Sequence, residues 1–262
     1  MDPSLSSAAS GMMAQQRRVE VISNNLANVN TTGFKRSRAH FEDLLYQTVQ
    51  GAQSVQGSQA DTTQEVQVGR GTRLAAVQRV ESQGPLQSTG RPLDLAVEGE
   101  GFFQIQLPSG EVGYTRDGSF TISDQGTLVT NGGYGLVPGI SVPQEASNLV
   151  ISRTGVITVQ LRGSPDPVEV GRIELARFSN SPGLRAMGEN LFQETAASGP
   201  PNLGFPQDEG FGRILQGTLE GSNVEIVQEM VDMITALRAY EINSKAVQSS
   251  EEMAEIANSL FR

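Results

Sequence analysis

The spacing of apolar residues changes twice along this chain, and that change most constrains its fold. Near the N-terminus, apolar positions recur at alternating steps of three and four residues, with one glutamine among them: Leu5, Ala8, Met12, Gln15, Val19, Ile22, Leu26 and Val29. Asp2 followed by Pro3 is typical of a helix start, and Gly33 is typical of a stop. The pattern predicts an N-terminal helix of about 25 residues.

The C-terminal segment carries two apolar stripes on one predicted helix. Ser222 and Glu225 have the spacing of a capping box, which predicts a helix start there. One stripe contains Ile226, Met230, Met233, Leu237, Tyr240 and Val247, and the other contains Ile242, Ala246, Ser249, Met253, Ile256 and Leu260. The stripes are offset by two residues, or about 200° around a helix. Because one partner helix covers one stripe, we expect a second copy of the chain to cover the other.

An alternative for the C-terminal segment is a break in the helix at residues 249–252, where the sequence reads Ser-Ser-Glu-Glu. A short last piece would then pack separately and would need no second copy. The apolar pattern favours the unbroken helix, although Ser244 interrupts the first stripe.

Between the two ends, from about residue 74 to residue 178, the apolar spacing becomes two. Residues 93–97, 103–107 and 157–161 follow this alternation. Turn sequences that favour positive φ separate such segments: Asp117-Gly118, Asp124-Gln125-Gly126 and Asn131-Gly132-Gly133. The middle of the chain is therefore predicted to form a predominantly antiparallel β domain.

Two stretches lack apolar periodicity and are predicted to connect the helices with the β domain. Residues 51–71 are rich in Gln, Ser, Thr and Gly, and residues 179–221 are rich in Gly, Pro and Asn. The expected fold class is α+β: long N- and C-terminal helices pair as a coiled-coil-like core domain, and a predominantly antiparallel β domain is inserted between them. The expected regions are a discontinuous helical core domain (1–40 plus 220–262), a connector region (41–75 plus 200–219) and the β domain (76–199).

Composition excludes most kinds of chemistry. The net charge of −10 argues against nucleic acid, because phosphate binding requires a basic surface. The absence of cysteine excludes disulfides and thiolate metal sites, and the single histidine, His40, excludes an intramolecular multi-histidine metal site. No apolar run is long enough to span a membrane, and residues 1–14 lack the pattern of a signal peptide. We expect neither membrane insertion nor a cleaved leader.

No motif in the sequence points to a catalytic or cofactor-binding site. The Gly99-Glu100-Gly101 segment lacks the third glycine of a dinucleotide-binding loop, and phosphate-loop and nucleophile-elbow motifs are absent from the sequence. Glu111, Asp117 and Asp124 could form a carboxylate pair, but their spacing is that of turns. We therefore expect no catalytic, cofactor-binding or metal-binding residue, no cofactor and no enzyme activity.

The end of the N-terminal helix is rich in asparagine. Asn24, Asn25 and Asn28 lie beside the apolar stripe, and residues 33–36 follow with the sequence Gly-Phe-Lys-Arg. Asparagine can bond neighbouring backbones in a crowded interface, although capping of the helix end is the simpler interpretation. This Asn-Asn-Leu-Ala-Asn core, followed by Gly-Phe and basic residues, resembles the N-terminal signature of the axial proteins of the bacterial flagellar rod and hook. A secreted adhesin, the alternative class with helical ends and a β domain, would not require it.

The resemblance covers essentially the whole chain. Residues 98–103 (Glu-Gly-Glu-Gly-Phe-Phe) and 114–120 (Tyr-Thr-Arg-Asp-Gly-Ser-Phe) resemble the β-domain motifs of that family. Residues 238–247 resemble its C-terminal helix. Within the family, residues 41–47, the Gln-rich connector and residues 220–224 are most similar to subunits of the distal rod, with a proximal rod or hook subunit as the alternative.

The resemblance implies a structural subunit that self-assembles into a hollow helical drive shaft. Such a shaft transmits motor torque through the periplasm to the hook and conducts exported subunits. The implied location is the basal-body rod, reached through the flagellar type III export apparatus without a cleaved signal peptide. The implied partners are further copies of the chain, proximal rod proteins, the hook protein or hook-rod junction, the surrounding LP-ring proteins and the export apparatus.

The resemblance also implies that the terminal helices line the inner core of the tube, with the β domains outside. The helix ends would then become ordered only when neighbours bury their second stripes, which is coupled folding and association. The connector over about residues 47–71 is implied to brace adjacent subunits. The residues expected to make subunit contacts are Leu5, Met12, Val19, Ile22, Asn24, Asn25, Leu26, Asn28, Val29, Ile226, Met230, Met233, Leu237, Tyr240, Ile242, Met253, Ile256 and Leu260.

Overall fold

The computed structural model describes residues 3–50, 66–162 and 166–260. The chain divides into two compact units. Unit 1 comprises Met1–Leu26, Ser37–Gln78 and Glu225–Arg262, and unit 2 comprises Ala27–Arg36 and Arg79–Val224. The backbone therefore passes from one unit to the other after residues 26, 36, 78 and 224.

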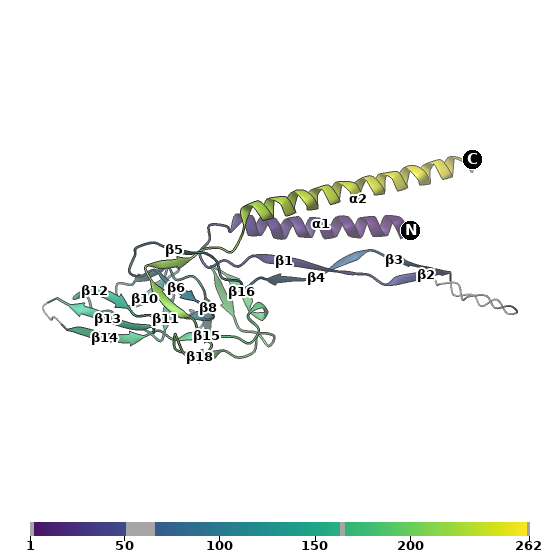
Figure 1. The fold of residues 1–262 in the computed structure, drawn as a ribbon. Helices are drawn as coiled ribbons and strands as arrows, with labels where there is room; N and C mark the ends of the chain where they lie inside the picture. The colour runs from purple at the N-terminus through teal and green to yellow at the C-terminus, as the bar shows by residue number, and fades with distance from the viewer. Residues whose placement is uncertain (1–2, 51–65, 163–165, 261–262) are drawn as a thin grey trace. The chain divides into compact units, whose positions relative to one another are not determined.

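Unit 1 contains two long helices and two β ribbons. Helices α1 (Pro3–Ala27) and α2 (Ile226–Leu260) run in opposite directions, so that the start of α1 and the end of α2 lie at the same end of the pair (Figure 1). Each ribbon has two strands: β1 (Ser37–Asp43) pairs with β4 (Thr72–Arg79), and β2 (Tyr46–Gln50) pairs with β3 (Val66–Gly69). The backbone amide of Thr72 donates to Ser10 Oγ at 3.2 Å, which holds the start of β4 against α1.

Helix α1 has the length that the apolar spacing predicts. It spans 25 residues and begins at Pro3, whereas its expected N-cap, Asp2, lies outside the described residues. The helix ends at Ala27, and a series of turns separates that end from Gly33. Gly33 has a φ of +67°, a left-handed conformation that glycine adopts with little strain. The expected stop residue therefore reverses the chain after the helix and does not cap it.

Helix α2 starts later than the capping box predicts, so the expected start at Ser222 is wrong. The Ser222 hydroxyl oxygen accepts a hydrogen bond from the backbone amide of Val224 at 3.3 Å, and the helix begins at Ile226. Residues 220–224 are held in a non-helical conformation by hydrogen bonds within unit 2, described below. The helix then continues without a break to Leu260, so the alternative of a break at residues 249–252 is also wrong.

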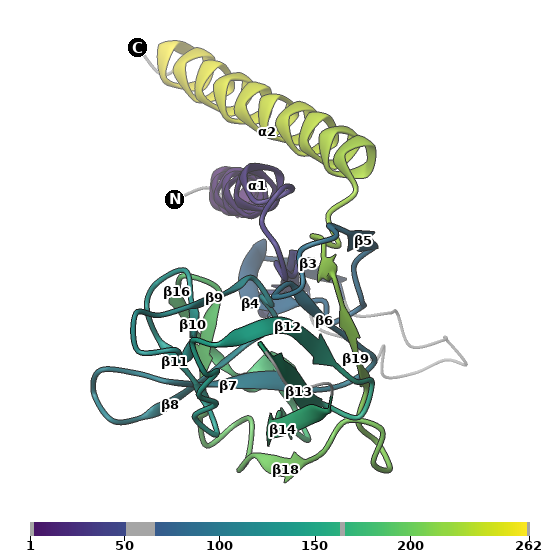
Figure 2. The same cartoon turned by 90° about the vertical axis from the view of Figure 1, so that its left-hand side faces the viewer.

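Unit 2 is built of short strands (Figure 2), and its described residues also include a 3-10 helix. Their bounds are β5 Leu86–Ser88, β6 Leu95–Glu98, β7 Phe102–Gln106, β8 Val112–Thr115, β9 Phe120–Ile122, β10 Leu128–Thr130, β11 Gly135–Val137, β12 Ala146–Ile151, β13 Val156–Leu161, β14 Pro167–Arg172, β15 Leu175–Arg177, η1 Ser181–Gly183, β16 Arg185–Gly188, β17 Leu191–Gln193, β18 Asn202–Gly204, β19 Arg213–Gln216 and β20 Thr218–Glu220. The largest sheet has nine strands, in the order β16-β17-β8-β7-β11-β10-β9, with β15 pairing both β7 and β18. Strands β12, β13 and β14 form a second sheet, and β6–β19 and β5–β20 are separate pairs.

Strand β7 lies between two apolar clusters, which explains why its burial exceeds what alternation predicts. Phe103 and Ile105 pack in the larger cluster, as the period of two indicates. Phe102, on the opposite face, packs in a second cluster with Tyr114 and Phe178. Gln104 on that same face is 4% exposed. An alternating apolar pattern predicts that only one face of a strand is buried. The second face of β7 is covered by residues distant in the sequence, such as Phe178.

The predicted turns occur, but one of their glycines serves a different purpose. Gly126, between β9 and β10, and Gly133, between β10 and β11, have φ values of +81° and +83°. Gly118 is instead required by close approach, since a Cβ there would lie 1.6 Å from the carbonyl oxygen of Leu95.

The regions expected to be connectors contribute paired strands. Strand β19 pairs with β6 in antiparallel register, and Ile214 within it is 1% exposed, so this part of the expected 200–219 connector belongs to the core of unit 2. Strand β20 pairs with β5 in the same manner. Of the expected 41–75 connector, β2, β3 and the start of β4 lie in unit 1, and residues 51–65 lie outside the described residues. With terminal helices and a large antiparallel middle, the fold class is α+β.

Candidate assembly surface

A buried asparagine joins α1, α2 and β1 within unit 1. Asn25, 1% exposed, donates from Nδ2 to the Ser37 carbonyl at 2.9 Å and to Glu229 Oε2 at 3.1 Å. Its Oδ1 accepts the Ser37 backbone amide at 2.8 Å. Glu229, near the start of α2, is 4% exposed. The sequence suggested that asparagines of this segment bond neighbouring backbones in an interface. Asn25 makes such bonds, but its partners Ser37 and Glu229 belong to the same subunit.

The face on which the two helices meet is formed mainly by small and polar residues. Arg18 and Asp232 form an ion pair at 3.2 Å, and a Cβ at Gly11 would lie 2.9 Å from Asn243 Nδ2. Ala236, between these contacts, is fully buried. The positions recur every seven residues, which keeps them on one face of each helix. We call this face the helix seam; it carries Gly11, Arg18 and Asn25 of α1 and Glu229, Ala236 and Asn243 of α2.

The apolar stripes of α2 lie mostly outside the helix seam and are exposed. The exposed fraction is 46% for Leu237 and 67% for Ile242. The other expected assembly residues of α2 that are exposed are Ile226, Met230, Tyr240, Met253 and Ile256. Met233 is half-buried, and the side chain of Leu260 is outside the described ones. The structure also exposes Val227, Val231 and Ile234, which neither stripe includes.

The expected assembly residues of α1 are more buried than those of α2. Ile22 and Asn25 are buried, and Asn24 is exposed. The remaining ones are partly exposed: Leu5, Met12, Val19, Leu26, Asn28 and Val29. Val29 and Asn28 follow the end of the helix. Sequence reasoning missed Gly11, Glu229, Ala236 and Asn243, whose signal is a seven-residue spacing of small and polar residues.

A second buried polar group lies inside unit 2, around the Gly-Phe-Lys-Arg segment. Lys35 Nζ donates to Glu220 Oε1 at 2.5 Å, and Arg116 lies on the other side of that carboxylate, with NH1 at 3.5 Å from Oε2. The side chains of Lys35, Glu220 and Arg116 are 2%, 0% and 8% exposed. We call these three residues the ionic cluster. Sequence reasoning missed it because its members are far apart in the chain.

Burial governs the electrostatics of the ionic cluster. Desolvation lowers the pKa of Lys35, and the Glu220 carboxylate opposes that shift. Desolvation likewise lowers the pKa of Arg116, again against the attraction of Glu220. The Arg116 guanidinium also donates to the carbonyls of Val97 at 3.2 Å and Gly99 at 2.8 Å. Glu220 is therefore the main counter-charge of two buried cations, with weaker contributions from Glu81 and Glu100, an arrangement suited to holding segments together.

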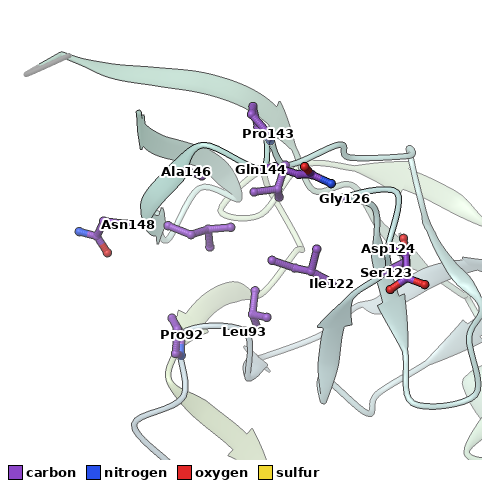
Figure 3. Close-up of a pocket in the computed structure, with 12 residues that line it drawn as sticks. Pro92, Leu93, Ile122, Ser123, Asp124, Gly126, Pro143, Gln144, Ala146 and Asn148 are labelled. Carbon is purple, nitrogen blue, oxygen red and sulfur yellow. The ribbon is translucent and has the colours of Figure 1, made fainter. Parts of the chain in front are cut away.

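One pocket of unit 2, beside β9 and β12, offers no catalytic constellation. It encloses about 700 Å³, and its walls are mainly apolar side chains such as Leu93 and Ile122, with Asp124 at one side (Figure 3). Across the described ranges, no three His, Cys, Asp or Glu side chains are grouped as metal ligands would be. Neither described helix is long and apolar enough to cross a membrane.

Family models match three separate parts of the chain. A model described as the D1 domain of the flagellar hook protein FlgE/F/G matches residues 96–159, most of the middle of unit 2. A model for the C-terminal region of flagellar basal body rod FlgEFG proteins matches residues 215–260, and one for flagella basal body rod proteins matches residues 5–35. These last two matches cover most of α1, all of α2 and two members of the ionic cluster, Lys35 and Glu220.

Curated relatives resemble the chain over nearly its whole length. The flagellar basal-body rod protein FlgG of Caulobacter vibrioides is 51% identical over 257 residues, covering 98% of both chains. FlgG of Borreliella burgdorferi is 52% identical, covering 97% of both. The rod protein FlgF of Caulobacter vibrioides is 34% identical over 98% of this chain and 97% of its own.

The two Caulobacter proteins decide between closely related subunits, because the FlgG relative is much more similar than FlgF from the same bacterium. The family is structural, so the chain is not an enzyme. The chain therefore belongs to the family of flagellar rod and hook axial proteins, in which it is a structural subunit of the distal rod of the basal body.

Proposed function

We propose that this subunit polymerises into a hollow helical drive shaft by burying the exposed stripes of α2 against other copies of itself. The exposure of Leu237, Ile242 and Ile256 is the observation that carries this proposal. Burying one such side chain contributes roughly 1.5–3 kcal/mol. Several of them on one 35-residue helix make α2 the strongest candidate for a contact between copies.

Within the assembled core, the terminal helices are proposed to pair in a coiled-coil-like manner. The seven-residue spacing of the helix seam supports this, since that spacing keeps one face of each helix in register with its partner. The seam consists of small and polar residues and buries few of the large apolar side chains. Pairing of α1 with α2 through the helix seam therefore leaves the apolar stripes of α2 uncovered within the subunit, and we propose that other subunits cover them.

The proposed shaft transmits motor torque through the periplasm to the hook and conducts exported subunits. Its proposed partners are proximal rod proteins, the hook protein or hook-rod junction, the surrounding LP-ring proteins and the export apparatus. The chain is proposed to reach the growing rod through that apparatus without a cleaved signal peptide. Family membership and similarity to FlgG over nearly the whole chain support these roles.

The ribbons of unit 1 are proposed to brace neighbouring subunits. Two-stranded ribbons are marginally stable by themselves, and these expose apolar side chains that a neighbour could cover. Leu45, between β1 and β2, is 86% exposed, and Tyr46 and Val68 lie on opposite strands of the β2–β3 ribbon. In the same proposal residues 1–40 and 220–262 form the core, and residues 76–199 form the outer part.

Deleting residues 54–63 is expected to make the rod bend or change its length while leaving export of the subunit intact. The deletion removes residues between β2 and β3, which lie outside the described structure, and so shortens the proposed brace. Electron cryomicroscopy of isolated basal bodies measures rod curvature and length. A straight rod of unchanged length would contradict the bracing role.

The position of the subunit along the axis is tested by labelling. An epitope inserted at the exposed turn at Gly110, in unit 2, is expected to appear on the distal rod in purified hook-basal bodies. Gold-conjugated antibody seen by electron microscopy gives the location. Label on the proximal rod or on the hook would contradict the proposed position and favour another axial role.

A further inference from the structure

We infer that Lys35, Glu220 and Asn223 are positioning residues of a clamp that ties together the places where the chain leaves unit 2. We call these three residues the root clamp. In the assembled subunit, the clamp shares any force on α2 among several backbone segments. This mechanical consequence rests on the proposed function, whereas the clamp itself rests on contacts within unit 2.

The root clamp lies where the chain changes units. The backbone leaves unit 2 after Arg36, re-enters it at Arg79 and leaves again after Val224. Asn223 precedes the last of these exits, and Lys35 precedes the first. Residues that contact each other at these points fix the spacing between the exits.

Asn223 binds both other segments through its side chain. Its Oδ1 accepts the backbone amide of Arg36 at 2.7 Å. Its Nδ2 donates to the carbonyl of Val80 at 2.8 Å and to that of Ser82 at 3.0 Å. The backbone amide of Val80 in turn donates to the carbonyl of Arg36 at 2.9 Å. Three segments that are distant in sequence thus meet at one amide side chain.

Glu220 joins the same segments a short distance away. Its side-chain Oε1 accepts Lys35 Nζ at 2.5 Å and the backbone amide of Gly84 at 3.0 Å. Its backbone carbonyl accepts the amide of Gly33 at 2.8 Å. Lys35 Nζ also donates to the carbonyl of Ser82 at 2.9 Å. The Lys35–Glu220 ion pair therefore joins the same three segments as Asn223 does, through charged groups instead of an amide.

Asn223 is the most informative residue at which to test the root clamp, because a single substitution can remove its donors and keep its acceptor. The amide supplies an acceptor to one segment and donors to another, which no other side chain of its size does. An aspartate of the same shape keeps the acceptor for the Arg36 amide but faces the Val80 and Ser82 carbonyls without a proton to donate. Asn223→Asp should therefore open the connection to residues 80–82 while leaving the apolar clusters intact.

Hydrogen exchange of the purified full chain tests the clamp without requiring assembly. In Asn223→Asp, amides of residues 80–84 are expected to exchange about tenfold faster, because the bonds from Nδ2 to the Val80 and Ser82 carbonyls are lost and local opening raises exchange only where bonds are lost. Amides of β7 are expected to keep their rates. Asn148→Asp, the same change on an exposed residue of unit 2, should leave both regions unchanged. Unchanged exchange at residues 80–84, or equal acceleration in β7, would overturn the inference.

If Asn223→Asp does not fold, as judged by circular dichroism, Asn223→Ala replaces it, because alanine adds no charge. Alanine also removes the acceptor of the Arg36 amide, so faster exchange is expected at Arg36 as well as at residues 80–84. A strain carrying the folded variant tests the mechanical consequence. Its basal bodies should be as numerous as in wild type, and its swimming speed should fall more in viscous medium than in dilute buffer. Equal sensitivity to viscosity would overturn the load-sharing role. If the proposed function is wrong, the wild-type chain itself will not be found in rods. The exchange result on the purified chain does not depend on that outcome.

Discussion

A chain carrying Leu237→Asp is expected to remain folded and to fail to polymerise. Leu237 is 46% exposed on α2, so the substitution disturbs little inside the subunit. In a polymer that buries this position, the variant loses the apolar contribution and must desolvate a carboxylate. Together these cost roughly 4 kcal/mol or more, which weakens association about a thousandfold. Electron microscopy for rods and circular dichroism for folding are the measurements.

Matched variants separate a surface effect from a general effect of added charge. Ile256→Asp, near the other end of α2, should also abolish rods, because it lies on the second stripe. Val150→Asp in β12 of unit 2 places the same charge at a side chain that is 49% exposed, and it should assemble normally. A motile strain with intact flagella in either α2 variant would refute assembly through these stripes.

Glu220→Gln is expected to lower the free energy of unfolding by about 3–5 kcal/mol, the usual cost of removing one partner of a buried ion pair. Glu220 is the carboxylate shared by Lys35 and Arg116, and all three side chains are nearly inaccessible to water. Glutamine has a similar shape but removes the principal counter-charge of two buried cations, leaving only the weaker attraction of Glu81 and Glu100. Urea unfolding of the full chain, followed by the near-ultraviolet circular dichroism of its tyrosines, measures the loss.

Substitutions of different members of the ionic cluster are expected to lower the free energy of unfolding by different amounts. Lys35→Met removes one cation and leaves Glu220 paired with Arg116, so it should destabilise the chain less than Glu220→Gln does. Glu98→Gln is the matched control, since Glu98 pairs with Arg213 at 2.6 Å on the surface, and its loss should be much smaller. If Lys35→Met proves at least as damaging as Glu220→Gln, the charge balance proposed for the cluster is wrong.

The helices show where sequence periodicity succeeds and where it fails. It predicted the length of α1 and an unbroken α2, because a repeated apolar spacing reflects helix geometry directly. It misplaced the start of α2, because Asn223 and Glu220 are bound to segments about 140 and 185 residues away. The capping preference of Ser222 is a local effect worth about 1 kcal/mol, and such tertiary bonds outweigh it.

The pairing face of the helices could not be inferred from apolar residues alone. The stripes that contain Leu237 and Ile242 drew attention because large apolar side chains carry most of the hydrophobic effect. Within the subunit, however, the helices meet through Gly11, Asn25 and Ala236. This face is visible in the sequence only as a seven-residue spacing of unrelated residue types, which no propensity scale rewards.

The sequence by itself determined the two terminal helices, the antiparallel character of the middle and the family, through local patterns such as the asparagine-rich segment before Gly33. Those patterns depend on neighbours within a few residues, so they can be read along the chain. Only the tertiary structure decided that Lys35 is buried against Glu220 and that α2 leaves its apolar stripes exposed. The physical reason is that burial and charge compensation depend on residues brought together from distant parts of the chain, and one-dimensional spacing does not record those distances.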